Sequence, residues 1–429
     1  ILNIDDWKIM NYFRSLLKTI AKSSSAQIID QIIYSALQFL VIALLVRVMP
    51  VTKFGDFSYA LVIFLTIKSF GTLGIGMEYI KNVALTNQDS KLIETMSVLI
   101  VRLVAAIVLI GVYFISAPLW ISSDDVQNLL NVMIIMIFIE AFKTTGEEYF
   151  TGTLKYEKII CIKLTSHIIF TLLKCYMLFI YRDFILFIYV NVLEVASLAL
   201  ILVLKIHFSS SRQLGHLEVS HYSRISDYLR SAAVLTLTAV SSMLLTRIDQ
   251  LMIYHIVDSS ALATYALSIR FIDVLNVVQV SICTYVFVAL TKQRPDGLEA
   301  SKVKVGYKLI ACVAIGLIVV AYILTTGFSV IFGDDYSVSG LYLMFLSPII
   351  FFGSISNMNA KLMYYNDQTK QIFMCTIESG ILNIILNLIL IPVYGVYGAI
   401  FSTLIVSFYI AIIRDYLYND LRYITKLRF

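Results

Sequence analysis

The sequence predicts an all-α integral membrane protein, with about 12 transmembrane helices arranged in two six-helix lobes around a central cavity. The first observation behind this prediction is composition. Of the 429 residues, 59% are hydrophobic and 14% are charged, whereas soluble domains average about 25% charged residues. A soluble domain of this composition would expose too much apolar surface to water. Lipid is therefore the expected solvent of the chain.

The second observation is the length of the apolar runs. A helix needs about 20 apolar residues to cross the hydrocarbon core of a bilayer. The runs are too long for transmembrane β-strands and lack their alternation of polar and apolar residues. Pro348 lies inside the tenth run and predicts a kink, either a static bend or a moving hinge. The twelve predicted spans cover residues 25–49, 56–78, 94–117, 128–149, 159–180, 184–205, 229–254, 261–289, 306–331, 338–360, 371–392 and 395–415.

The third observation is the distribution of basic residues between the loops. If the N-terminus is cytoplasmic and charged residues near the ends of spans are counted with the adjoining loop, 24 of the 33 lysines and arginines are cytoplasmic and 3 are external. Cytoplasmic loops of membrane proteins carry this excess. The asymmetry predicts that both termini are cytoplasmic. The net charge of +5 is thus explained by the basic residues of the cytoplasmic loops. We expect no nucleic-acid partner.

The predicted spans divide at the longest cytoplasmic loop, residues 206–228. An N-terminal lobe over 1–205 and a C-terminal lobe over 229–429 would then hold six spans each. Ser58-Tyr59-Ala60-Leu61 opens the second span, and Thr264-Tyr265-Ala266-Leu267 opens the eighth, at an offset of 206 residues. Transporters built from related halves commonly place the substrate site at the interface of the halves.

Ionisable residues occur well inside the predicted spans, where they usually face the protein interior. A cationic interior needs an anionic guest, and phosphate or pyrophosphate groups suit Arg and Lys. For Lys174 in the fifth span, a buried ion pair is the alternative to lining a cavity. The candidate substrate-binding cations are Lys68, Arg102, Lys174, Arg247 and Arg270.

The fifth span shows the geometry of these charges best. At 100° per residue, Lys163, His167 and Lys174 lie within about 40° of one another on one helical face. They predict a cationic stripe that runs toward the middle of the membrane.

Two further spans carry cations and carboxylates close together. Arg270 and Asp273 are spaced i, i+3 and can pair on one helix. Arg247 and Asp249 point to opposite sides of the seventh span, so each needs a partner elsewhere.

Carboxylates at depth are candidates for energy coupling to H⁺ or Na⁺. Asp249 is the first choice and Glu378 the second, because neither has a basic neighbour in the right helical position. The alternative for each is an ion pair with a cation on another helix.

No enzyme signature accompanies these charges. The chain lacks a Walker A loop, the external loops are short, and the five cysteines form no close Cys-x-x-Cys pair. We expect a transporter without a cofactor or metal site.

Three stretches resemble the polysaccharide (O-antigen type) flippases of the multidrug/oligosaccharidyl-lipid/polysaccharide exporter superfamily. They are LVRVMPVTKFGDFSYAL at 45–61, LLTRIDQLMIYHIVDSSALATYALSIRFID at 244–273 and NIILNLILIPVYGVYGAI at 383–400. Within them, the pattern includes Arg247-Ile248-Asp249-Gln250 and the small residues Gly395 and Gly398.

The resemblance implies a two-lobed flippase in the bacterial cytoplasmic (inner) membrane. Such a protein moves an undecaprenyl-pyrophosphate-linked oligosaccharide, such as an O-antigen repeat for lipopolysaccharide biosynthesis, by alternating access that an ion gradient drives. Its partners would be the lipid-linked substrate, membrane lipids, a polysaccharide polymerase and a chain-length regulator.

Two other functions remain open. A multidrug exporter of the same superfamily would carry cations, which an interior rich in Lys and Arg disfavours. A membrane polysaccharide polymerase would need a large external loop, and the sequence has none.

Overall fold

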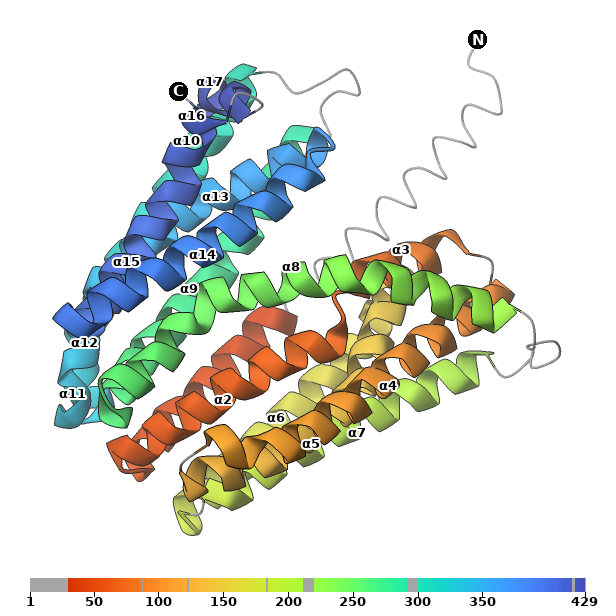
Figure 1. The fold of residues 1–429 in the computed structure, drawn as a ribbon, viewed down its shortest axis with the longest axis horizontal. Helices are drawn as coiled ribbons and strands as arrows, with labels where there is room; N and C mark the ends of the chain where they lie inside the picture. The colour runs from red at the N-terminus through yellow and green to blue at the C-terminus, as the bar shows by residue number, and fades with distance from the viewer. Residues whose placement is uncertain are drawn as a thin grey trace. The chain divides into compact units, whose positions relative to one another are not determined.

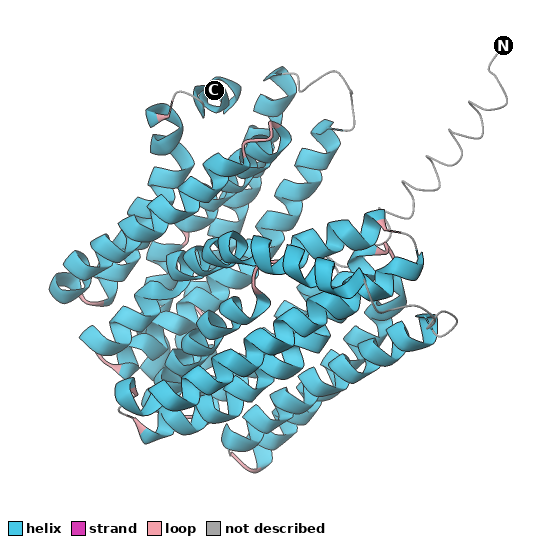
Figure 2. Ribbon diagram, turned by 45° about the vertical axis from the view of Figure 1, so that its right-hand side comes forward, coloured by secondary structure: helices cyan, strands magenta, loops and turns pink. Residues whose placement is uncertain are grey.

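The computed structural model of the chain describes residues 30–86, 88–121, 123–182, 184–210, 220–291, 300–418 and 421–428. These residues form helices joined by short turns, and no strand occurs among them (Figure 2). The all-α fold predicted from the sequence is confirmed.

Ten helices within the described ranges are long and apolar enough to cross a membrane, or eleven if one bent pair counts as a single span. The bent pair joins Asp334–Leu346, which includes α12 (Ser337–Leu346), to α13 (Pro348–Tyr365), with a bend of 41°. Pro348 occupies the first turn of α13, where its missing N–H costs nothing. The predicted kink in the tenth span is confirmed.

The seventh predicted span lies within α8 (Ser220–Ile256), which is not among these ten. Charged residues such as Arg224, Arg230 and Arg247 interrupt the apolar sequence of this helix. Each of the twelve predicted spans thus corresponds to a helix. The number of candidate membrane spans, judged by length and hydropathy, is ten or eleven rather than twelve because α8 is too polar to be counted.

The chain forms two compact units that do not coincide with continuous halves. Unit 1 contains Ile67–Ala239 together with the chain up to Val41, and unit 2 contains Ile42–Thr66 and Val240–Phe429. The helix Asp30–Val48, α2 (Val51–Thr72) and α8 each contribute to both units. The two six-span lobes divided at 206–228 remain a prediction, and residues 211–219 of that loop lie outside the described ranges.

Unit 1 is built around the long helix α5, which packs against α3, α4 and α7, while α6 packs against α7 (Figure 1). The lipid-facing sides of these helices expose large apolar residues such as Ile115 and Leu172. One side of α6 instead buries polar residues, which need partners inside the unit. The helices wholly in unit 1 are α3 (Gly76–Leu85), α4 (Gln88–Trp120), α5 (Asp124–Gly152), α6 (Glu157–Ile180) and α7 (Phe184–Ser210).

Unit 2 packs α9 against α10, α12 and α13, and joins α14 to α15 by a tight turn. Gly395 makes this turn with φ of +58°, a conformation that L side chains rarely adopt. A Cβ atom on Gly398 would lie 2.2 Å from the Leu390 carbonyl oxygen. Gly398 therefore permits close packing of α15 against the end of α14, whereas a Cβ atom on Gly395 would meet nothing within 4 Å. The remaining helices of unit 2 are α9 (Ser259–Thr291), α10 (Ala300–Thr325), α11 (Phe328–Phe332), α14 (Thr369–Tyr394), α15 (Val396–Phe408), α16 (Arg414–Leu417) and α17 (Arg422–Arg428).

Candidate functional site

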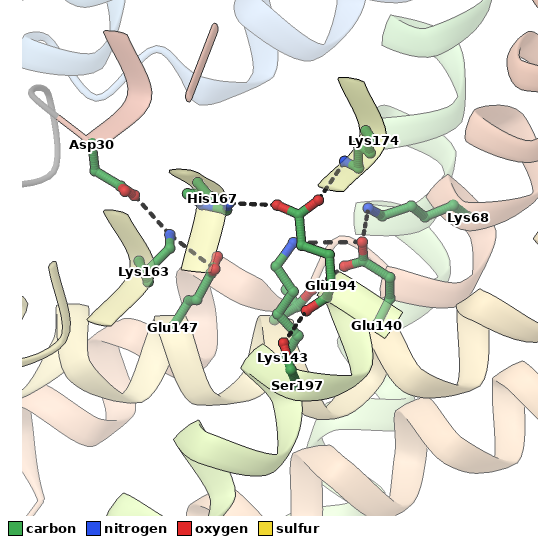
Figure 3. Close-up of polar contacts among 11 residues, drawn as sticks. Asp30, Lys68, Glu140, Lys143, Glu147, Lys163, His167, Lys174, Glu194 and Ser197 are labelled. Carbon is green, nitrogen blue, oxygen red and sulfur yellow. Dashed lines mark hydrogen bonds and ion pairs between the residues drawn. The ribbon is translucent and has the colours of Figure 1, made fainter. Parts of the chain in front are cut away.

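The interior of unit 1 contains a network of charged side chains that come from several helices (Figure 3). Its members lie on the helix Asp30–Val48 and on α2, α4, α5, α6 and α7. Lys163, His167 and Lys174 lie on the buried side of α6, as their spacing predicted. The predicted polar face of α6 is therefore confirmed, and its side chains contact groups on neighbouring helices.

Glu194 on α7 meets two members of that face. Its carboxylate forms an ion pair with Lys174, whose side chain is fully buried, and it lies 2.6 Å from Nδ1 of His167. For Lys174, the structure thus contains the buried ion pair that was the alternative to a cavity-lining role. A single carboxylate thus contacts both the Lys174 ammonium and the His167 ring.

Lys163 is surrounded by oxygen acceptors. Its ammonium lies 2.7 Å from an Asp30 carboxylate oxygen, 2.9 Å from Glu147 and 2.7 Å from the Tyr156 hydroxyl. The Tyr156 hydroxyl donates to Asp30 over 2.7 Å. Tyr156 lies in the turn before α6, where burial, reinforced by Glu147 and Asp30, raises the pKa of its hydroxyl far above the usual range. Tyr156 therefore stays protonated and can donate.

Two further groups of ion pairs complete the network. Glu140 on α5 lies 3.0 Å from the Lys68 ammonium and 3.6 Å from that of Lys143. Arg102 on α4 forms a two-point contact with Glu148, at 2.8 and 3.1 Å, and donates to Thr145. These geometries leave few N–H groups without acceptors.

The expected cationic stripe is therefore corrected to a charge-balanced network. Burying a lone ammonium in an apolar environment costs several kcal/mol, and a carboxylate partner offsets that cost. Five buried or half-buried cations meet five carboxylates within unit 1: Lys68, Arg102, Lys143, Lys163 and Lys174 meet Asp30, Glu140, Glu147, Glu148 and Glu194.

A cavity of about 230 Å³ opens beside the network, still within unit 1. We call it the Asp30 cavity. Its wall combines acidic, basic and aromatic side chains, namely Asp30, Gln31, Tyr34, Lys143, Glu147, Tyr156, Lys163 and His167.

Unit 2 holds the other candidate cations. Arg247 on α8 forms an ion pair with Asp273 on α9 at 2.8 Å, a partner that helical spacing did not predict. Arg270 on α9 is half-buried and also has interaction partners. Both side chains of the Arg247–Asp273 pair retain partial exposure, so this pair is more accessible than Lys174 in unit 1.

The two candidate coupling carboxylates differ in their surroundings. Asp249 is buried and accepts hydrogen bonds from the Tyr265 hydroxyl and the Gln250 backbone N–H, and no ion pair to it occurs among the described residues. Glu378 lies 3.1 Å from Nε of Arg414 and accepts from the Tyr418 hydroxyl at 2.6 Å. The alternative of a cation on another helix therefore holds for Glu378.

Several members of the unit 1 network are not among the candidate residues predicted from the sequence. Lys143, Glu147 and Glu148 lie on α5, near the end of the predicted span 128–149. Asp30 lies near the start of the first span. A period-3.6 reading of α5 would have placed Glu140, Lys143 and Glu147 on one face, since they are spaced i, i+3 and i+7.

The sequence profile of the family described as polysaccharide biosynthesis protein matches residues 20–289. This match covers more than half of the chain. The chain belongs to this family. No curated protein sequence matches it.

Solved structures with the same fold are transporters and a flippase. The lipid II flippase MurJ in an inward closed conformation has a TM-score of 0.74 at 15% identity, covering 93% of this chain and 89% of the flippase. A multidrug resistance MATE family transporter of the MOP superfamily, inward-facing, has a TM-score of 0.68 at 12% identity, covering 92% and 95%. A MOP superfamily transporter from Pyrococcus furiosus, reported for the reverse polarity of its binding pocket, has a TM-score of 0.64 at 14% identity, covering 96% and 97%. The chain thus shares its fold with these transporters and with the flippase.

Proposed function

We propose that the protein is a flippase that moves an undecaprenyl-pyrophosphate-linked oligosaccharide across the bacterial cytoplasmic membrane by alternating access. The observation that carries this proposal is the family match together with the polar interior of unit 1. A lipid-linked oligosaccharide has a large hydrophilic head that must cross an apolar layer. The charged and hydroxyl groups buried in unit 1 can replace part of its water shell.

A multidrug exporter is the second candidate, because the transporter with a TM-score of 0.68 is one. The charge-balanced network of unit 1 no longer argues against a cationic guest as strongly as a cationic stripe would. The family match to polysaccharide biosynthesis favours the flippase.

The test is complementation in a bacterium that lacks its own flippase for a defined lipid-linked repeat. The wild-type gene should restore surface polysaccharide, and the purified protein should move the same lipid-linked oligosaccharide across proteoliposome membranes. Drug efflux without either activity would favour the multidrug exporter. Neither activity with any lipid-linked oligosaccharide would refute the proposal.

Arg247 provides the informative variant for this test, because we propose that it binds the pyrophosphate. Its partner Asp273 is 39% exposed, so Arg247→Ala leaves no fully buried charge behind. The variant should reach the membrane in normal amounts and lose surface polysaccharide. Normal polysaccharide in Arg247→Ala would remove this residue from the binding site.

Ion coupling is proposed for Asp249, which can accept H⁺ or Na⁺ without first breaking an ion pair. Asp249→Asn should abolish substrate-driven ion flux in proteoliposomes and leave substrate binding largely intact. Glu378→Gln is the comparison, since Glu378 is already paired with Arg414. Normal coupled flux in both variants would end the proposal that either carboxylate couples transport to an ion.

A further inference from the structure

The Asp30 cavity contains an unmet hydrogen-bonding requirement. Asp30 is 4% exposed, and its Oδ1 atom has no hydrogen-bond partner among the described residues. A buried acceptor without a partner costs about 1–3 kcal/mol, and more for a charged group. The cavity therefore favours a guest that brings a donor to this oxygen.

The Lys163 ammonium beside Asp30 does not need an additional hydrogen-bond acceptor. The Lys163 ammonium has three N–H groups, and three acceptors surround it: Asp30, Glu147 and the Tyr156 hydroxyl. A phosphate could bind Lys163 only by displacing one of them. The neighbourhood of Lys163 thus disfavours an added anion.

The charges around the cavity also balance. Lys143 and Lys163 face Asp30 and Glu147 on its wall. Immediately behind the wall, Glu140 pairs with Lys143 and Lys68, while Glu194 pairs with His167 and Lys174. Four ammonium groups thus meet four carboxylates here, so the guest that adds no uncompensated charge is itself neutral.

The remaining wall residues suit a ring with polar edges. Tyr34 lies against His167 with ring centroids 4.5 Å apart, and Tyr156 contributes a second aromatic ring. Gln31 adds an amide. Aromatic surfaces with a few converging polar groups are the usual lining of small-molecule sites. A volume of about 230 Å³ is too large for one water molecule, whose share of liquid volume is about 30 Å³.

We propose that the Asp30 cavity binds one neutral sugar ring, whose hydroxyl groups donate to Asp30 and Glu147 and whose apolar face lies against Tyr34. The assignment of this ring to the transported oligosaccharide rests on the proposed flippase function. The binding of the ring itself does not. The cavity is a saccharide site within unit 1 and leaves the pyrophosphate to be bound elsewhere.

The experiment is saturation-transfer difference NMR on the purified full chain in detergent. The probes are methyl glycosides of glucose, galactose, mannose and N-acetylglucosamine, with inorganic phosphate as a competitor. At least one glycoside should bind, phosphate should not displace it, and Asp30→Asn should weaken it about ten-fold, as expected for a lost hydrogen bond to a charged group. Asp124→Asn is the matched control, because Asp124 is an exposed carboxylate of the same unit.

Failure of every glycoside to bind, displacement by phosphate or equal affinity in Asp30→Asn would overturn the proposal. If Asp30→Asn does not yield monodisperse protein, Gln31→Leu replaces it, and we expect weakening of about three-fold from the loss of a neutral hydrogen bond. Glycoside binding without flipping would refute the flippase function alone. Flipping without glycoside binding would refute the saccharide site alone.

Discussion

Unit 1 and unit 2 bury their polar groups in different ways. In unit 1, ammonium groups such as Lys174 meet carboxylates such as Glu194 on other helices. Unit 2 relies more on neutral groups: Asn383 donates to the Leu245 carbonyl at 2.7 Å and accepts from Asn387 at 2.8 Å. Both arrangements give most of these polar atoms a partner, and each leaves an exception, Asp30 Oδ1 in unit 1 and Asn387 Oδ1 in unit 2.

The energetic consequences of the two arrangements differ. Removing one member of a buried ion pair strands the other charge, whereas removing a neutral amide strands only dipoles. The stability of unit 1 should therefore depend on charge complementarity. That of unit 2 should depend on hydrogen-bond geometry.

The largest expected effect comes from stranding Lys174. Glu194→Gln leaves a fully buried ammonium without its carboxylate, which should cost about 3–5 kcal/mol of stability. The yield of monodisperse protein and resistance to unfolding in detergent measure the loss. The double variant Glu194→Leu/Lys174→Met should recover most of it, because no charge remains buried. A double variant less stable than Glu194→Gln would contradict the charge-complementarity account of unit 1.

A smaller effect is expected from the amide in unit 2. Asn383→Leu removes the hydrogen bonds to Leu245, Asn387 and Ser402 but strands no charge. The loss should be about 1–3 kcal/mol, below that of Glu194→Gln in the same assay. Equal losses in the two variants would remove the distinction between the units.

The smallest effect concerns Asp258, an exposed residue that precedes α9. Its carboxylate accepts from the Ser260 hydroxyl at 2.6 Å and from the Ala261 backbone N–H at 2.7 Å. The Ser260 contact, followed by that of Ala261, lowers the pKa of Asp258. Asp258→Ala should cost about 1 kcal/mol at neutral pH, as is usual for a lost N-terminal helix cap.

The lowered pKa fixes the sign of the pH dependence of this cap. The stabilisation is fully present above the unfolded-state pKa of Asp258 and is lost as pH falls through the lower folded-state pKa. The difference in unfolding between wild type and Asp258→Ala should thus shrink in acid. A difference that grows on acidification would show that the carboxylate form is not the better cap.

The sequence by itself determined the membrane-spanning, all-helical class of the protein. It also located a helix for each predicted span, the bend at Pro348 and the polar face of α6. These features depend on the length of apolar runs, on a missing N–H and on the 3.6-residue period, all of which are local properties. The family resemblance was equally accessible, because its motifs are contiguous.

Only the tertiary structure decided what the buried charges do. Lys174 on α6 and Glu194 on α7 are 20 residues apart in sequence, and Lys163 meets Asp30 from a helix far away along the chain. A cation in an apolar run gives the same sequence signal whether it lines a cavity or pairs with a distant carboxylate. Which of the two occurs depends on the packing of one helix against another. In unit 1, that packing places carboxylates beside the cations of the predicted stripe and forms a charge-balanced network beside the Asp30 cavity.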